Sequence, residues 1–82
     1  MLEAQINITL KKTVSDPQGQ TIKHALVSLN FDKLSNVRIG KYVVINIEGN
    51  DKKKAEEDVK DMCKKLLANP IIEDYSFQIR EI

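Results

Sequence analysis

The side chains that could perform covalent chemistry are few in this sequence. It contains one cysteine, Cys63, one histidine, His24, and no tryptophan. A thiol with an imidazole base beside it would make a nucleophilic site. Cys63, however, falls on the apolar stripe of a predicted helix, whereas His24 lies about 200° around its own predicted helix from Ile22. We therefore expect Cys63 to be a buried structural thiol and His24 to face solvent, so that the two do not form a pair.

Metal and acid–base chemistry are also poorly supported. His24 has no carboxylate beside it at helical spacing, and a single cysteine can form neither an intrachain disulfide nor a cysteine-based zinc site. Acidic residues at positions 56, 57, 58 and 61 are interleaved with lysines at 60, 64 and 65. Because the pairs Glu56–Lys60 and Asp61–Lys65 have i, i+4 spacing, this pattern predicts a solvated, salt-bridged helix face.

Two cations and a glycine interrupt an otherwise apolar run over residues 36–49, NVRIGKYVVINIEG. In a regular strand Lys41 would point into the core, which is costly for an unpaired charge. A bulge or turn at Gly40 and Lys41 would relieve this conflict by resetting the alternation. The run lacks the glycine-rich loop of a phosphate site, and Tyr42 is its only candidate for stacking on a base. We therefore interpret Arg38 and Lys41 as exposed cations at a bend, presented to a partner.

The DPQG sequence at residues 16–19 predicts the start of a helix. Asp16 suits the N-cap, and Pro17 suits the first helical position, where its missing N–H costs nothing. Gly19 stands where backbone N–H groups could hold an anion. The segment matches no phosphate-loop pattern, so local physics favours a plain helix entry.

A small number of strands and helices must position these residues. Residues 4–11, AQINITLK, alternate apolar and polar side chains, which is typical of a strand with one buried face. The helix that begins at Asp16 is expected to end at Asn30 and to bury one apolar stripe. Residues 36–47 predict two strands or one long strand with a sharp bend, residues 51–69 a second helix, and residues 74–82 a last strand. The stripe of the first helix consists of Ile22, Ala25, Leu26 and Leu29.

The β-α-β-β-α-β order indicates an α+β fold. It favours a ferredoxin-like two-layer sandwich, with an antiparallel sheet and both helices on one of its faces. The length of 82 residues indicates a single domain, residues 1–82. A domain of this size buries only a limited core, so association with another chain would add stability.

Composition narrows the function classes. Thirteen basic and twelve acidic side chains leave a net charge of +1, which gives no general attraction to nucleic acid or to an anionic membrane. The longest apolar run, residues 42–45, is far too short to cross a membrane. The first ten residues lack the features of a signal peptide, so we expect a cytoplasmic protein.

Three segments carry a resemblance to a known family. They are DPQGQTIKHALVSLNF at 16–31, NVRIGKYVVINIEG at 36–49 and MCKKLLANPIIEDYSFQI at 62–79. In this order and spacing they closely resemble the PurS family, the small subunits of bacterial and archaeal phosphoribosylformylglycinamidine (FGAM) synthase. The most diagnostic pieces are DPQG at 16–19, VRIGKY at 37–42, and LLANP at 66–70 followed by IEDY, which ends at 75. The departures, at Ser15, Asn30 and residues 52–54, lie outside these pieces.

The resemblance implies a role in purine biosynthesis, as a subunit of a glutamine-dependent, ATP-consuming ligase. A PurQ-type glutaminase subunit would release ammonia, and a PurL-type synthetase subunit would use it. The small subunit would bridge the two, support ammonia transfer and form a homodimer or tetramer. ATP and Mg²⁺ are expected in the large subunit, with no active site, cofactor or metal in this chain. The residues that match the family's motifs, and are therefore expected at a subunit interface, are Asp16, Pro17, Gln18, Gly19, Arg38, Gly40, Lys41, Tyr42, Asn69 and Pro70.

Three other functions remain open from the residues alone. The main alternative is a ferredoxin-like regulatory domain that senses a small molecule at a dimer interface, and it would show saturable ligand binding by the isolated chain. A nucleic-acid-binding module is disfavoured by the near-neutral charge and the few aromatic residues. A stand-alone enzyme would be indicated by turnover by the purified chain.

Overall fold

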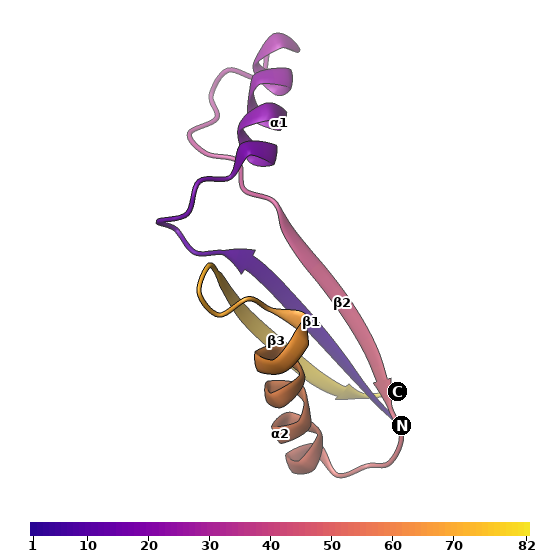
Figure 1. Cartoon of the computed structure of the whole chain (residues 1–82). Coiled ribbons are helices and arrows are strands. Elements are labelled where there is room, and N and C mark those ends of the chain that lie inside the picture. Colours follow the sequence, from indigo (N-terminus) through magenta and orange to yellow (C-terminus); the bar gives the residue numbers. More distant parts are fainter.

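The computed structural model describes all residues from Met1 to Ile82. Along the chain the elements are β1 (Leu2–Leu10), α1 (Pro17–Ser28), β2 (Gly40–Ile47), α2 (Lys52–Met62), a π-helical turn η1 (Cys63–Leu67) and β3 (Glu73–Glu81). The strands form one antiparallel sheet in the order β2-β1-β3 (Figure 1). No helix combines the length and apolar character that crossing a membrane requires.

The central strand β1 contributes the sheet side of the hydrophobic core. Its even-numbered residues from Leu2 to Ile8 are buried, as the alternation in the sequence predicts. β1 pairs with β2 from Leu2↔Ile47 to Thr9↔Gly40 and with β3 from Leu2↔Glu81 to Leu10↔Glu73. Both neighbours therefore run along almost the whole length of β1.

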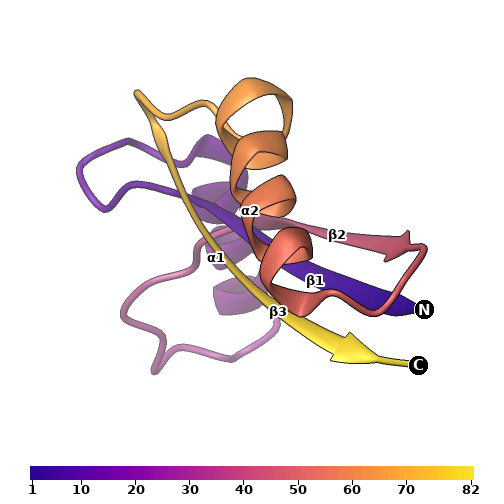
Figure 2. The ribbon, with the colours of Figure 1, turned by 90° about the horizontal axis from the view of Figure 1, so that it is seen from below.

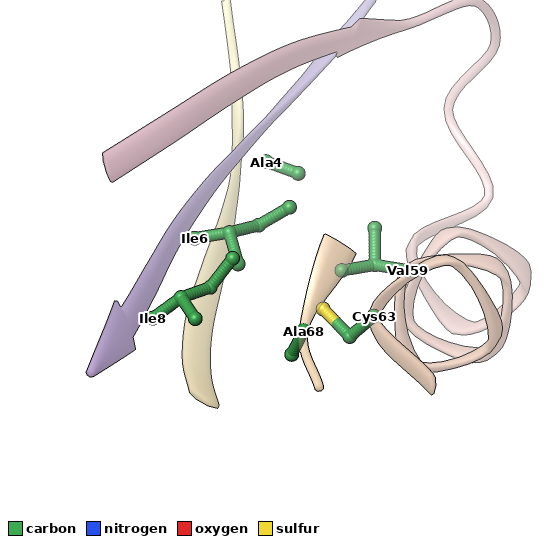
Figure 3. Packing of buried hydrophobic residues seen from close by; sticks show 6 residues of the cluster. All are labelled: Ala4, Ile6, Ile8, Val59, Cys63 and Ala68. Atoms are coloured by element: carbon green, nitrogen blue, oxygen red, sulfur yellow. The ribbon is translucent and has the colours of Figure 1, made fainter. Parts of the chain in front are cut away.

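Helix α2 packs on one face of this sheet. Its N-cap is Asp51, whose Oδ1 accepts a hydrogen bond from the Lys54 N–H at 3.1 Å. Its apolar stripe turns toward β1, and the thiol of Cys63 is buried there, as predicted. Burial raises the pKa of this thiol, because it disfavours the charged thiolate. The packed cluster shown in Figure 3 consists of Ala4, Ile6, Ile8, Val59, Cys63 and Ala68.

Helix α1 does not lie on the sheet. It projects beyond the end at which β1 leaves the sheet and β2 enters it, and both termini lie at the opposite end (Figures 1 and 2). The molecule is consequently elongated, with extents of 48 × 28 × 15 Å and a radius of gyration of 16.2 Å. A compact domain of this length has a radius of gyration of about 12 Å.

The expected α+β class, antiparallel sheet and element order are confirmed, with two differences. The middle β region forms a single strand that begins at Gly40, preceded by the extended residues 36–39. Of the two helices expected on one face, only α2 is there. Because β1 and β2 are antiparallel neighbours, they meet at the same end of the sheet, and the chain between them has no need to cross the sheet face.

Candidate functional site

The side chain of Asp16 joins two segments at the end of the sheet. Its Oδ1 accepts a hydrogen bond from the Gly19 N–H at 2.9 Å, which caps α1, and its Oδ2 accepts one from the Ile39 N–H at 2.7 Å. The hydrogen bond from Ile39, followed by that from Gly19, lowers the pKa of this carboxyl. Asp16 is the only buried charged side chain. The expected cap is therefore confirmed, and it has a second partner that links α1 to the entry of β2.

Two glycines in the motifs are sites of close approach. A Cβ on Gly19 would lie 2.2 Å from the Val37 carbonyl oxygen, and one on Gly40 would lie 2.7 Å from the Ile8 carbonyl oxygen. The β1–β2 register continues without interruption from Gly40 through Lys41. The bulge predicted at Gly40 and Lys41 is therefore wrong. Gly40 allows β2 to begin tightly against β1, and no extra residue resets the alternation.

Lys41 shows how the sheet accepts a cation at a core-facing position. It pairs with Ile8, one pair before the end of the ladder, and its side chain is 61% exposed. Its Nζ lies 3.4 Å from Oε2 of Glu73, the first residue of β3. The charge is thus paired and mostly hydrated, which removes the conflict that the bulge was meant to solve.

Glu73 also holds the turn that contains Asn69 and Pro70. Its Oε1 accepts a hydrogen bond from the Asn69 N–H at 2.7 Å, and the Asn69 carbonyl accepts from the N–H groups of Ile72 and Glu73. The Asn69 Oδ1 accepts from the Ile71 N–H at 3.1 Å. The hydrogen bond from Asn69 and then the charge of Lys41 lower the pKa of Glu73. The Glu73 carboxylate therefore connects the turn that contains Asn69 and Pro70 to Lys41 of β2.

Arg38 extends this junction toward the end of β1. Its Nη2 donates to the Lys11 carbonyl at 2.9 Å, and the Lys11 Nζ lies 2.8 Å from Oδ1 of Asp74. These contacts hold the guanidinium at the surface in a defined position. Tyr42 is 60% exposed. It pairs with Asn7 in the sheet ladder, on the opposite face from Lys41.

The DPQG, VRIGKY and LLANP segments thus meet at one end of the sheet. We call this region the junction, formed by residues 16–19, 38–42 and 69–74. An open cavity of about 280 Å³ lies within it, and eight residues line it: Ile8, Leu10, Asp16, Gln18, Ile39, Gly40, Lys41 and Glu73. Pro17 lies in a separate groove at the base of α1, with Ile22 and Ile39. Pro70 lines a third cavity with Lys11 and Asp74.

The sequence analysis missed three contributors to the junction. Lys11, Glu73 and Asp74 make its ion pairs. The signal was available for Glu73 and Asp74, because both lie within the matched segment at 62–79, shortly after Asn69 and Pro70. Their partners, however, are 32 positions away for Glu73 and 63 positions away for Asp74, and only the sheet register brings them together.

The junction contains no arrangement for nucleophilic catalysis. Cys63 is buried under the sheet, and His24 is exposed on α1. No group of three or more histidine, cysteine, aspartate or glutamate side chains is placed to hold a metal ion. The junction offers paired charges, hydrogen-bonded backbone turns and open cavities.

Comparison with known proteins decides the family. The family model of PurS, described as phosphoribosylformylglycinamidine (FGAM) synthase, matches residues 3–81. The chain belongs to the PurS family. PurS of Bacillus subtilis is 43% identical over 82 residues, covering 100% of this chain and 96% of that protein. PurS of Methanocaldococcus jannaschii is 44% identical, covering 100% and 99%.

Solved PurS structures show the same fold. The B. subtilis PurS structure matches with a TM-score of 0.88 over 99% of this chain and 100% of that one, at 43% identity. The M. jannaschii PurS structure, described as a subunit of formylglycinamide ribonucleotide amidotransferase, has a TM-score of 0.89, with 44% identity, over 100% and 99%. A structure of PurLQS from Thermotoga maritima matches with a TM-score of 0.87 and 32% identity, over 96% of each chain. The projecting α1 is therefore part of the PurS fold, because these matches span nearly the whole chain.

Proposed function

We propose that this chain is the non-catalytic small subunit of FGAM synthase and that it assembles with a PurL-type synthetase and a PurQ-type glutaminase. The observation that carries the proposal is the full-length match to PurS subunits, including the PurS-like chain in a structure described as PurLQS. The inventory of side chains agrees with this role, since it holds no nucleophile–base pair.

The proposed reaction explains why a bridging subunit is useful. The glutaminase releases ammonia from glutamine. The synthetase uses ATP to activate the formyl amide oxygen of formylglycinamide ribonucleotide, and ammonia displaces the resulting phosphate to give formylglycinamidine ribonucleotide. ATP and Mg²⁺ bind the synthetase subunit in this scheme, and this chain holds no cofactor. The chain keeps the two active sites together, so that ammonia reaches the second site before it is lost to water. The complex would act in the cytoplasm.

The junction is the surface that we assign to contact with a partner subunit. Arg38 uses one of its N–H groups on the Lys11 carbonyl, which fixes the guanidinium in place. A guanidinium carries five N–H donors, so others remain for bidentate contact with a carboxylate. Lys41 and Tyr42 are also largely exposed beside it. All ten motif-matched residues lie in or beside the junction, which supports a shared role in binding.

Binding is tested by co-elution. The purified chain is mixed with the PurL-type and PurQ-type subunits of the same organism, in the presence of glutamine, ATP and Mg²⁺, and the mixture is separated by gel filtration. We expect one complex that contains all three chains and that loses PurQ when this chain is omitted. Separate elution of this chain under all conditions would contradict the proposal.

The small-molecule-sensing alternative is not favoured. The relatives compared above are PurS subunits of a synthase. Two of the cavities of the junction region are lined by charged side chains that are already paired with one another, Lys11 with Asp74 in one and Lys41 with Glu73 in the other.

A further inference from the structure

Lys11, the first residue after β1, makes hydrogen bonds with its N–H, its carbonyl and its ammonium group. The N–H donates to the Ile72 carbonyl at 2.8 Å, and Nζ donates to Oδ1 of Asp74 at 2.8 Å. The carbonyl accepts from the Val14 N–H at 2.9 Å and from Nη2 of Arg38 at 2.9 Å. Lys11 therefore ties the start of β3 to the turn that follows β1 and to the residues that lead into β2.

The adjacent lysine shows that these contacts are particular to Lys11. The side chain of Lys11 is partly buried, with 37% of its surface exposed. Lys12 is exposed, and its ammonium makes no hydrogen bond or ion pair. Neither residue lies within the three segments that resemble the PurS family. The two lysines look alike in the sequence, and only the structure separates them.

The Arg38 guanidinium depends on Lys11 for its orientation. The hydrogen bond from Nη2 to the Lys11 carbonyl is the one that this side chain makes. Arg38 precedes β2, and its own backbone makes no hydrogen bond to another backbone group. The main chain is held at the next residue, where the Ile39 N–H donates to Asp16 at 2.7 Å, but this contact leaves a long side chain free to rotate. The position of the Lys11 carbonyl therefore sets the position of the guanidinium.

A guanidinium that is fixed before binding is a better contact for a partner. Binding normally immobilises a long, flexible side chain, and the loss of its rotamer freedom weakens association. A side chain that is already held in its bound orientation does not lose this freedom again. The planar, bidentate contact of a guanidinium with a carboxylate also requires a defined orientation.

We propose that Lys11 is a positioning residue for the binding of a partner subunit. Anchored to β3 through Asp74 and Ile72, it holds the Arg38 guanidinium in the orientation in which a carboxylate of the partner meets it. Lys11 acts through Arg38 and does not itself contact the partner. This inference rests on the proposed function, in which Arg38 contacts a PurL-type or PurQ-type subunit.

The first test uses the isolated chain and measures the guanidinium groups by ¹⁵N nuclear magnetic resonance. The sequence has only two arginines, Arg38 and Arg80. Arg80 is the internal reference, because its Nε donates to Glu3 at 3.0 Å, near the other end of β3. A hydrogen bond to one Nη hinders rotation about the Cζ–Nε bond, so the two Nη groups of Arg38 should give separate signals in the wild type.

Two variants with the same change in charge are compared in this measurement. We expect Lys11→Met, which removes the ammonium that binds Asp74, to merge the Nη signals of Arg38 and to leave those of Arg80 unchanged. Lys12→Met is the matched control and should leave both arginines unchanged. Arg38 signals in Lys11→Met that equal those of the wild type would overturn the proposal.

The second test is a double-mutant cycle on binding to the PurL-type and PurQ-type subunits, with glutamine, ATP and Mg²⁺ present. We expect Lys11→Met to raise the dissociation constant about two- to tenfold, the effect of freeing one long side chain. In the Arg38→Ala background the same substitution should have almost no effect, because the group that Lys11 positions is gone. Lys12→Met and Lys11→Arg, which keeps a cation for Asp74, should bind as wild type does.

The cycle separates positioning from direct contact. An equal rise in the dissociation constant with and without Arg38 would show that Lys11 contacts the partner itself, and no rise in either background would show that its ion pair is only structural. Either result would overturn the proposal. If the wild-type chain forms no complex, the proposed function fails instead, and the spectrum of the isolated chain still decides whether Lys11 positions Arg38.

Discussion

At the scale of single residues, two side chains determine how the three sequence motifs meet. One carboxylate oxygen of Asp16 accepts a hydrogen bond from the first turn of α1, and the other accepts one from Ile39, just before β2. One carboxylate oxygen of Glu73 accepts a hydrogen bond from the Asn69 N–H, and the other lies near the Lys41 ammonium. Both carboxyls have a lowered pKa because they accept hydrogen bonds in the folded state. Each therefore stabilises the fold in its ionised form.

Replacing Asp16 by asparagine tests this dependence on charge. The amide keeps one acceptor but places an N–H₂ group opposite one of the two backbone N–H donors, so we expect Tm at pH 7 to fall by about 5–10 °C. The folded pKa of Asp16 lies below its ordinary value of 3.8. Its contribution is therefore fully present above that value and is lost as pH falls through the lower, folded pKa.

The measurement is thermal unfolding followed by circular dichroism at pH 7 and at about pH 2. We expect the difference in Tm between wild type and Asp16→Asn to shrink at the lower pH. The exposed Asp32→Asn serves as the matched control and should change Tm little at pH 7. A difference for Asp16→Asn that is the same at both pH values would show that the charge of Asp16 is not involved.

Gly19 offers a second residue-scale prediction. Alanine normally favours a helix over glycine by about 1 kcal/mol. At this position its Cβ would lie 2.2 Å from the Val37 carbonyl oxygen, so α1 would have to move away from the strand entry. We expect Gly19→Ala to lower the free energy of unfolding by about 1–3 kcal/mol in urea titrations. Gln20→Ala, exposed on the same helix, is the control. A Gly19→Ala chain as stable as the control would disprove the close contact.

At the scale of elements, the sheet and α2 stabilise each other by burying apolar side chains between them. Val59 and Cys63 are fully buried against β1, whereas Leu66, on η1, is 84% exposed. The same helical segment thus has one side that packs and one that does not. Truncation of an apolar side chain should therefore have very different effects on its two sides.

Val59→Ala and Leu66→Ala test this difference. Removal of two buried methyl groups and the cavity they leave should lower the free energy of unfolding by about 2 kcal/mol for Val59→Ala. Leu66→Ala should change it by less than about 0.5 kcal/mol. Both are measured by urea unfolding at one fixed chain concentration, since association adds to apparent stability. Equal losses would show that α2 does not pack as described.

The elements themselves could be predicted from the sequence, but their relative placement could not. Period-2 alternation in residues 4–11 and period-3.6 spacing in both helices report which face of an element is apolar. They do not report where that face lies in the fold, so the sequence predicts the stripe of α1 in the core, whereas Ile22 and Leu29 are exposed. The bulge at Lys41 was wrong for a related reason. The pattern shows that Lys41 is at a core-facing position, but only the structure shows that its side chain is mostly exposed and that its Nζ lies beside Glu73.

At the scale of the whole molecule, the junction and the projecting helix α1 lie at the same end of the sheet, and both termini lie at the opposite end (Figure 1). The motif-matched residues therefore gather at one end of an elongated chain.

Arg38→Ala tests whether the junction binds a partner subunit. We expect the dissociation constant for the complex with the PurL-type and PurQ-type subunits to rise by about tenfold or more. Circular dichroism of the isolated chain should be unchanged, because the guanidinium is at the surface and makes one hydrogen bond. Lys53→Ala, exposed at the far end of α2, is the control and should bind as wild type does. Normal binding by Arg38→Ala would remove Arg38 from the interface.

The most direct test of the central claim is reconstitution of glutamine-dependent synthesis. The PurL-type and PurQ-type subunits are assayed for formylglycinamidine ribonucleotide with glutamine as nitrogen donor, with and without this chain. Ammonia-dependent synthesis by the PurL-type subunit alone is the control. We predict that glutamine-dependent activity appears only when the chain is present, while ammonia-dependent activity is the same with and without it. Full glutamine-dependent activity in its absence would contradict the assignment of this chain as the subunit that couples the two active sites.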